Sequence, residues 1–238
     1  ISLYLFMELV LEKKPKNATI IEGFPGFGLV ATIATEYLVD HLDATQIGKI
    51  VMEEIPPIVA VHSGKVIEPI GIFYSKKYNL VILHVLTSVN GFEWKMAKII
   101  EELCKQLSAK EILCIEGVGS MSGTTNAYYI SEKNAKKFKE KAKIERLTDG
   151  IIMGVTGSLM LNKKLPVSCI FAETHSNMPD SAAASKIIEV LDSYLGLKVD
   201  PKPLLEKAKK VEEKIQSLLN QSKTAVNQKQ RKELTYLG

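Results

Sequence analysis

The feature that most constrains the fold is a series of short, almost uniformly apolar runs. Six of these runs have the length of a strand and end in residues typical of turns: KIVMEE, PIVAVHS, PIGIFYS, LVILHVLTS, EILCIEG and VSCIFAET. A sheet with one face in water alternates polar and apolar residues, whereas strands that are apolar throughout need cover on both faces. The sequence therefore predicts a central sheet between two layers of helices.

Segments with helical periodicity alternate with these runs. One follows Asn90, an expected N-cap, and places six apolar residues on one face: Phe92, Met96, Ile99, Ile100, Leu103 and Leu107. Another is predicted to start after Pro179-Asp180 and to end at Gly196 as its C-cap. A hairpin turning at residues 76–79 makes the sheet mixed. We therefore predict a three-layer α/β/α domain over residues 1–200.

Composition agrees with a folded domain of this size, because 46% of the 238 residues are hydrophobic. No apolar stretch reaches the roughly 18 residues needed to span a bilayer, and the opening ISLYLFMELVL is predicted to be a first strand rather than a signal peptide. The three cysteines, Cys104, Cys114 and Cys169, have no CxxC spacing and are expected to be buried thiols. We expect a cytoplasmic protein without a membrane partner.

The composition changes after residue 200. Residues 201–222 are predicted to form an amphipathic helix, whose apolar positions repeat at spacings of three and four: Leu204, Ala208, Val211, Ile215 and Leu218. This stripe fits either packing on its own domain or contact between subunits. Residues 223–238 are predicted to be a flexible basic tail with apolar residues near its end.

The excess of basic over acidic residues lies in this region, since residues 201–238 contain nine Lys or Arg against four Asp or Glu. A nucleic-acid reader carries basic and aromatic residues on its folded surface, so nucleic acid is not an expected partner.

The stretch GFPGFG follows an apolar run and precedes a helical pattern. Its residues are Gly23, Phe24, Pro25, Gly26, Phe27 and Gly28. With Glu53 or Glu54 as a ribose ligand, it could bind the pyrophosphate of a dinucleotide. However, bulky apolar residues lie between the glycines and the acid comes late, so a compact structural loop is the preferred interpretation and no cofactor is expected.

Two other motifs are weak. GVGSMSG has methionine where the nucleophile of a G-x-S-x-G elbow would stand, which argues against a serine hydrolase. Glu173, His175 and Asp180 follow a strand and could contribute to a metal site, but Glu-x-His supplies only two ligands. We expect a loop acid and a polar helix cap there, and no metal.

Several segments together resemble the proteasome assembly chaperone two family, in particular its archaeal members. They are IIEGFPGFGLVATIATEYLVDHL, NLVILHVLTS, GFEWKMAKIIEELCKQLSAKEILCIEGVGS, GIIMGVTGSLML and ETHSNMPDSAAASKIIEVLDSYLGLKVD, which span residues 20–200. The resemblance implies a phosphorylase/hydrolase-like α/β/α fold. It also implies a non-enzymatic homo-oligomer that binds the α-ring of the core proteasome as a chaperone or activator, with a tetramer preferred.

Proteins that bind the proteasome in this way often end in a hydrophobic–tyrosine–any motif, which enters pockets between α-ring subunits. The corresponding residues here are Leu234, Tyr236, Leu237 and Gly238, and they depart from the motif because Tyr236 is third from the end. Two alternatives remain at this point: an α/β enzyme or nucleotide-binding protein that uses the glycine loop, and an oligomeric scaffold unrelated to proteasomes.

Overall fold

The computed structural model describes residues 7–55, 59–62, 65–119, 124–175, 178–199, 205–206, 208–213 and 215–217. Within them, nine strands form one sheet in the order β1-β3-β6-β7-β2-β8-β11-β9-β10. In chain order these strands are β1 (Met7–Leu11), β2 (Thr19–Gly23), β3 (Thr45–Met52), β6 (Ile70–Ser75), β7 (Leu80–Val85), β8 (Glu111–Gly119), β9 (Ala127–Ser131), β10 (Glu145–Arg146) and β11 (Val167–Thr174).

The sheet is mixed, as the sequence predicts. Its centre is parallel, because β7, β2, β8 and β11 all run in one direction. The β1, β3 and β6 strands add to it through antiparallel pairings, and β9 pairs antiparallel with β11. The predicted hairpin is confirmed, since β6 and β7 are antiparallel neighbours that pair Ser75 with Leu80.

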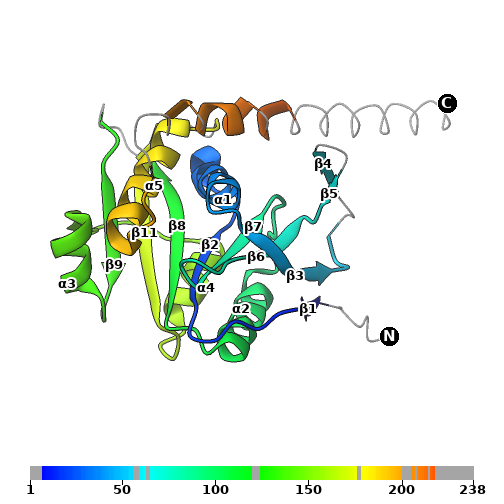
Figure 1. The fold of residues 1–238 in the computed structure, drawn as a ribbon. Coiled ribbons are helices and arrows are strands. Elements are labelled where there is room, and N and C mark those ends of the chain that lie inside the picture. Colours follow the sequence, from blue (N-terminus) through cyan, green and yellow to red (C-terminus); the bar gives the residue numbers. More distant parts are fainter. Residues whose placement is uncertain are drawn as a thin grey trace, which may run out of the picture.

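Helices cover both faces of this sheet (Figure 1). On one face, α1 (Val30–His41) and α5 (Ser181–Leu195) pack in a core that includes Ile21, Leu113 and Ile170. On the other face, α2 (Glu93–Leu107) and α4 (Gly154–Leu161) pack on Ile20, Cys114 and Phe171. Neighbouring residues of one strand thus enter opposite cores, which explains why the strands are apolar throughout and confirms the three layers.

Three short elements complete the domain: a 3₁₀ turn η1 (Phe27–Leu29), a helical turn α3 (Ala135–Lys137) and a π-helical turn η2 (Phe138–Ala142). Phe138 stacks between Tyr129 of β9 and Tyr194 of α5, with ring centroids 4.8 and 4.3 Å apart, and so closes the edge of one core. No helix in the described ranges is both long and apolar enough to cross a bilayer.

Two predictions of local detail need correction. The run PIVAVHS does form a strand, β4 (Ala60–His62), but β4 pairs with β5 (Lys65–Ile67) in a separate two-stranded sheet. Asn90 is not the cap of α2, because the helix begins at Glu93 after Phe92, without a capping hydrogen bond from a side chain. By contrast, α5 has the predicted caps: the Asp180 side chain accepts from Ala183 N at 2.9 Å, and Gly196 has φ +72°.

Candidate functional site

The glycine-rich loop joins β2 to α1 by a tight path along the carboxyl edge of the sheet. Gly28 has φ +64°, and a Cβ there would lie 2.7 Å from Thr174 Oγ1 on β11. The Gly28 carbonyl accepts a hydrogen bond from Asp180 N at 2.9 Å. The neighbouring strand β8 also approaches the loop closely, since a Cβ on Gly117 would overlap the Phe27 carbonyl oxygen. The loop is therefore packed against two strands and the start of α5 through its backbone.

The two phenylalanines of this loop have different surroundings. Phe24 is partly buried against the core under α2 and α4, whereas the Phe27 side chain is 42% exposed. The charged side chain that approaches the loop is Glu116, whose Oε1 would lie 3.5 Å from a Cβ on Gly26. A carboxylate in this position repels the phosphate that a dinucleotide-binding loop would hold.

The second half of the dinucleotide pattern does not form either. Glu53 and Glu54 follow β3, which is separated from β2 by β6 and β7. In dinucleotide-binding sheets the acid that binds the ribose lies beside the glycine loop. Glu54 instead lies 3.4 Å from the Lys95 ammonium of α2, and the place of β3 in the sheet argues against either residue as the ribose ligand of the dinucleotide alternative.

A cavity of about 830 Å³ opens beside the loop. Two glutamates from adjacent parallel strands line it, Glu116 on β8 and Glu173 on β11. A third glutamate, Glu22 on β2, has no exposed surface, and its register partner on the neighbouring strand β8 is Cys114. Thr156 of α4 donates a hydrogen bond to Glu22 Oε1 at 3.4 Å. The carboxyl ends of three neighbouring strands therefore each bring one carboxyl group to this region.

Burial changes the acidity of two of these groups. The pKa of Glu22 is raised to about 8. Loss of solvent is the main cause and the nearby Glu116 carboxylate adds to it, while hydrogen bonds from the Cys114 thiol and the Thr156 hydroxyl act in the opposite direction. Loss of solvent likewise raises the pKa of Glu116 to about 7. One oxygen of each carboxyl is buried without a hydrogen-bond partner among the described atoms. Near neutral pH, Glu22 is therefore largely protonated and Glu116 is close to its midpoint.

The mouth of the cavity combines exposed apolar side chains with further charges. Ile151 is 89% exposed and Met153 is 73% exposed, and both lie in the segment between β10 and α4. The described charged and polar side chains that line the cavity are Asn90, Glu93, Glu116, Tyr128, Arg146, Thr148, Asp149 and Glu173. Acidic residues thus outnumber the single described basic residue in this lining.

The three residues considered for a metal site have separate roles. Glu173 Oε2 accepts hydrogen bonds from the backbone and side-chain nitrogens of Asn126, at 3.1 and 2.8 Å. Asp180 caps α5 and accepts from Thr174 Oγ1 at 2.7 Å, which confirms the predicted polar cap. His175 is exposed. The described residues contain no group of three side chains that could hold a metal ion.

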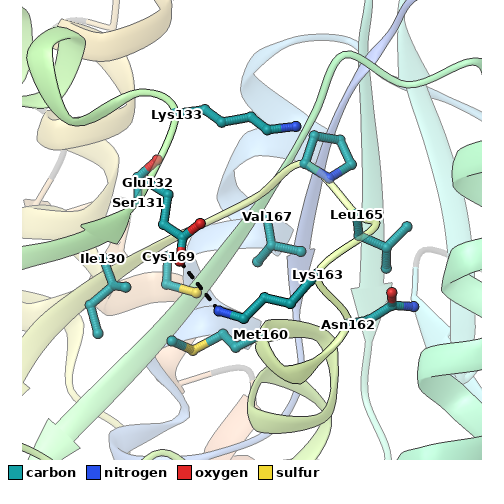
Figure 2. A pocket seen from close by; sticks show the side chains of 11 residues that line it. Ile130, Ser131, Glu132, Lys133, Met160, Asn162, Lys163, Leu165, Val167 and Cys169 are labelled. Atoms are coloured by element: carbon teal, nitrogen blue, oxygen red, sulfur yellow. Dashed lines mark hydrogen bonds and ion pairs between the residues drawn. The ribbon is translucent and has the colours of Figure 1, made fainter.

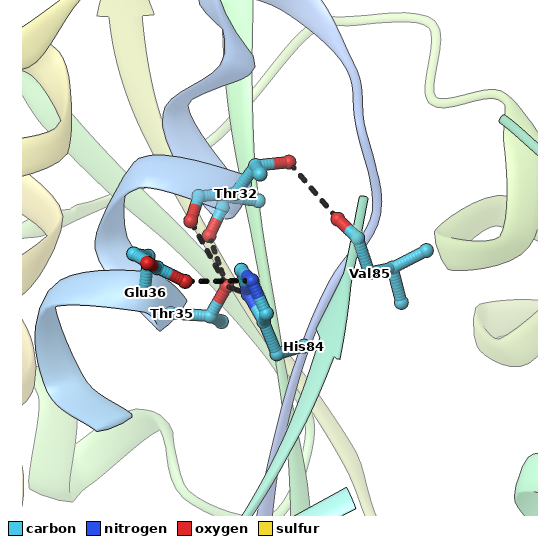
Figure 3. Close-up of polar contacts among 6 residues, drawn as sticks. Thr32, Thr35, Glu36, His84 and Val85 are labelled. Atoms are coloured by element: carbon cyan, nitrogen blue, oxygen red, sulfur yellow. Dashed lines mark hydrogen bonds and ion pairs between the residues drawn. The ribbon is translucent and has the colours of Figure 1, made fainter. Parts of the chain in front are cut away.

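A buried polar cluster on the opposite face of the sheet was not predicted (Figure 3). His84 of β7 lies between two residues of α1: its Nδ1 is 2.8 Å from Thr35 Oγ1, and its Nε2 is 2.9 Å from Glu36 Oε2. His84 is 1% exposed, so this cluster links the strand to the helix inside the core. A polar residue inside the otherwise apolar run LVILHVL was the signal available in the sequence.

A smaller cavity of about 100 Å³ lies at the amino end of β11 (Figure 2). Lys163 and Glu132 form an exposed ion pair there at 3.2 Å, and Cys169 lies beneath. All three cysteines are buried free thiols, as predicted. Burial raises the pKa of Cys104 and Cys114, which leaves these thiols protonated and unreactive.

The described part of the C-terminal helix packs on the domain. Residues 205–206, 208–213 and 215–217 are helical, and Ala208 and Ile215 are buried in the core of α1 and α5, with Val211 partly buried beside them. Ser181 N donates to Glu212 Oε2 at 3.2 Å, which links this helix to the start of α5. The other residues predicted for the helix and tail contacts lie outside the described residues: Leu204, Leu218, Leu234, Tyr236, Leu237 and Gly238. Residues 120–123 of GVGSMSG also lie outside them.

Comparison with known proteins places these features in one family. PbaA of Pyrococcus furiosus, an archaeal homolog of proteasome-assembly chaperone, superimposes with a TM-score of 0.81 and 29% identity over 92% of this chain and 99% of its own. PbaB of the same organism, an archaeal proteasome activator, gives a TM-score of 0.74 and 22% identity over 89% and 98%. The uncharacterized protein MJ0106 of Methanocaldococcus jannaschii is 24% identical over 87% of each chain. The sequence profile of the PAC2 family matches residues 20–219, and this chain belongs to that family.

Proposed function

We propose that this chain acts as a proteasome assembly chaperone or activator: a non-enzymatic homo-oligomer that binds the α-ring of the core proteasome. The observation that carries the proposal is the likeness to PbaA over nearly the whole of both chains, in sequence and in fold. The likeness to PbaB, a proteasome activator, supports it at the level of the fold. We prefer a tetramer as the assembled form.

The proposed contact is made by the segment 234–238. Leu234, Tyr236 and Leu237 supply apolar anchors that would enter the pockets between α-ring subunits, while the basic residues before them remain in solvent. Such a short segment buries little surface and must become ordered on binding, so one contact is weak. Several copies on one oligomer, facing repeated pockets, raise the overall affinity without new contacts.

The lining of the cavity argues against a bound nucleotide or dinucleotide. Its described lining includes no Ser, Cys, His or Lys side chain, and the carboxyl groups beside the glycine loop disfavour a bound phosphate. An enzyme or nucleotide-binding protein would be stabilised by its ligand through mass action. We therefore expect no shift of the melting temperature with nucleotides, dinucleotides or divalent metals in a thermal scan.

The decisive experiment is a pulldown of archaeal core proteasome with the full chain and with a chain that ends at Glu233, combined with peptide hydrolysis on the same samples. We expect the truncation to abolish association while the oligomer mass is unchanged. A matched control replaces two polar tail residues, Gln228→Ala and Gln230→Ala, and should bind normally. Retained binding by the truncated chain would exclude the tail contact.

The hydrolysis assay separates the two roles. Tail-dependent binding with faster peptide hydrolysis identifies an activator, and binding without faster hydrolysis identifies an assembly chaperone. Absence of binding by the full chain contradicts the proposal and favours a scaffold unrelated to proteasomes.

A further inference from the structure

The large cavity lies at the point where the direction of the chain reverses within the sheet. From β2 the chain continues to β3 on one side, and from β8 it continues to β9 on the other side. Open α/β sheets bind ligands at such a point, beyond the carboxyl ends of the parallel strands. The volume of about 830 Å³ lies in the range of small-molecule sites. The fold therefore places the cavity where a ligand is expected.

Carboxyl groups from four separate segments line this cavity. They belong to Glu93 at the start of α2, Glu116 on β8, Asp149 between β10 and α4, and Glu173 at the end of β11. Arg146 is the one basic side chain of the described lining. The whole chain has the opposite sign, with a formal net charge of +4. A multivalent cation is therefore attracted to this site rather than to the molecule as a whole.

Glu116 has an oxygen that lacks a partner. Its Oε2 is buried without a hydrogen bond among the described atoms, whereas Glu173 Oε2 accepts from Asn126 at 2.8 and 3.1 Å. Close to it, Glu22 is wholly buried, and its Oε2 also lacks a described partner. An ionised carboxyl group in such surroundings costs free energy unless a positive charge lies near it. A cation bound in the cavity beside Glu116 offsets that cost.

Apolar side chains share the lining with these carboxyl groups. Phe27, Ile151 and Met153 are 42%, 89% and 73% exposed. Exposed apolar side chains gathered at a concave site mark a surface that contacts another molecule. A metal ion offers no apolar surface to such residues, and a phosphate is repelled by the carboxylates. The ligand chemistry that fits both features is a chain of methylene groups with several ammonium groups.

We propose that the cavity between the glycine loop and residues 146–154 binds an aliphatic polyamine. Its ammonium groups pair with the carboxylates of the lining, with Glu116 as the most enclosed contact, and its methylene groups pack on Phe27, Ile151 and Met153. The ligand links residues 146–154 to the glycine loop and so restricts their motion. This site goes beyond the proposed proteasome contact and does not depend on it.

Binding is tested by isothermal titration calorimetry of the full-length protein with spermidine at low salt. We expect saturable binding to one site per chain and a rise of the melting temperature. Glu116→Gln should weaken the affinity at least about tenfold, because it removes the charge of the enclosed contact. Glu12→Gln is the matched control, since Glu12 is exposed and outside the lining, and it should bind within about twofold of the unchanged protein.

A second pair of variants changes exposed residues, which keeps the test independent of folding. Asp149→Asn should weaken spermidine several-fold, and Asp40→Asn, at an exposed acid of α1 outside the lining, should not. Equal losses in both members of either pair overturn the proposal, because they would show attraction to acidic groups in general. Absence of saturable binding up to about 10 mM spermidine also overturns it.

Two comparison ligands test the chemical class. Mg²⁺ carries charge without methylene groups, and butylamine carries one ammonium group on a methylene chain. We expect both to bind at least about tenfold more weakly than spermidine. Equal affinity for Mg²⁺ would mean that charge alone is recognised. Equal affinity for butylamine would assign the site to a single alkylammonium group, such as a lysine side chain of a protein. Either result overturns the polyamine assignment.

Hydrogen exchange locates the bound ligand. Spermidine should slow amide exchange in residues 146–154 and leave residues 135–142, which do not line the cavity, unchanged. Equal protection of both segments, or of neither, contradicts the proposed site. The Glu116→Gln variant should still bind core proteasome in the pulldown, which separates failure of this inference from failure of the proposed function.

Discussion

Glu22 and Glu116 are two carboxyl groups whose protonation near neutral pH depends on the fold. They lie on neighbouring strands, on the face covered by α2 and α4, and burial raises the pKa of Glu22 to about 8 and of Glu116 to about 7 from 4.5. Between pH 4.5 and these values the folded protein retains protons that the unfolded chain releases. Stability therefore falls as pH rises through this window, by up to about 1.4 kcal/mol per pH unit for each group.

Replacing Glu22 by Gln should remove this dependence for one of the two groups. Glu22→Gln keeps the shape of the side chain and is neutral at every pH, so its free energy of unfolding should decline less than that of the unchanged protein between pH 5 and 8. Urea denaturation at pH 5, 6, 7 and 8 measures the difference, which should widen in favour of the variant. The exposed Glu12→Gln serves as the control. If the Glu22→Gln and unchanged curves run parallel, Glu22 ionises normally in the folded protein.

Among the elements, the glycine loop restricts its sequence both by backbone conformation and by close packing. Gly28 combines a left-handed backbone with contact to Thr174, whereas Gly154, at the start of α4, has φ +72° and open space around its Cβ position. Gly154 is thus a control that has the left-handed backbone of Gly28 but no close contact at the Cβ position. Comparison of the two separates the cost of conformation from the cost of packing.

Gly154→Ala should lower the free energy of unfolding by about 1 kcal/mol, because an L residue in the left-handed region is strained. Gly28→Ala should cost about 2–4 kcal/mol, since β11 and the start of α5 must also move away from the new methyl group. Thermal and urea denaturation of both variants provide the test. If both variants lose the same free energy of unfolding, the contact of the new methyl group with Thr174 adds no cost.

Features that depend on consecutive residues could be predicted from the sequence, whereas contacts between distant segments could not. The α5 caps and the β6–β7 turn were predictable because each depends on a few consecutive residues, such as Asp180 and Gly196. Asn90 failed as a cap because the chain turns before the helix, with Phe92 N bonded to Val89 O. The link from His84 to Thr35 and Glu36 could not be predicted, since it depends on β7 lying beneath α1.

The candidate site also combines a local motif with contacts between distant segments. GFPGFG was recognised from its spacing as a compact loop, but the segment 146–154 that completes the cavity has neither strand alternation nor helical periodicity. Glu22 and Glu116 lie near the ends of apolar runs, where a charged residue indicates the start of a turn. Only the parallel register of β2 and β8 brings them to one face.

At the scale of the whole molecule, the proposed function depends on several copies acting together. A soluble peptide 221–238 presents the same apolar residues as the assembled protein, but it makes one contact. We expect the peptide to bind core proteasome at least about 100-fold more weakly than the oligomer, because linked contacts raise the effective concentration of each tail. Biolayer interferometry with immobilised proteasome measures both affinities, and native mass spectrometry gives the subunit number, expected to be four.

A full-length variant with Leu234, Tyr236 and Leu237 replaced by alanine is the control for this measurement. It should keep the mass of the oligomer and lose proteasome binding, because only the three side chains of the proposed proteasome contact are changed. If the peptide binds as tightly as the oligomer, a single tail accounts for the affinity and the multivalent mechanism is wrong. If the alanine variant forms a smaller oligomer than the unchanged protein, the tail also contributes to assembly, contrary to the expected separation of assembly from proteasome binding.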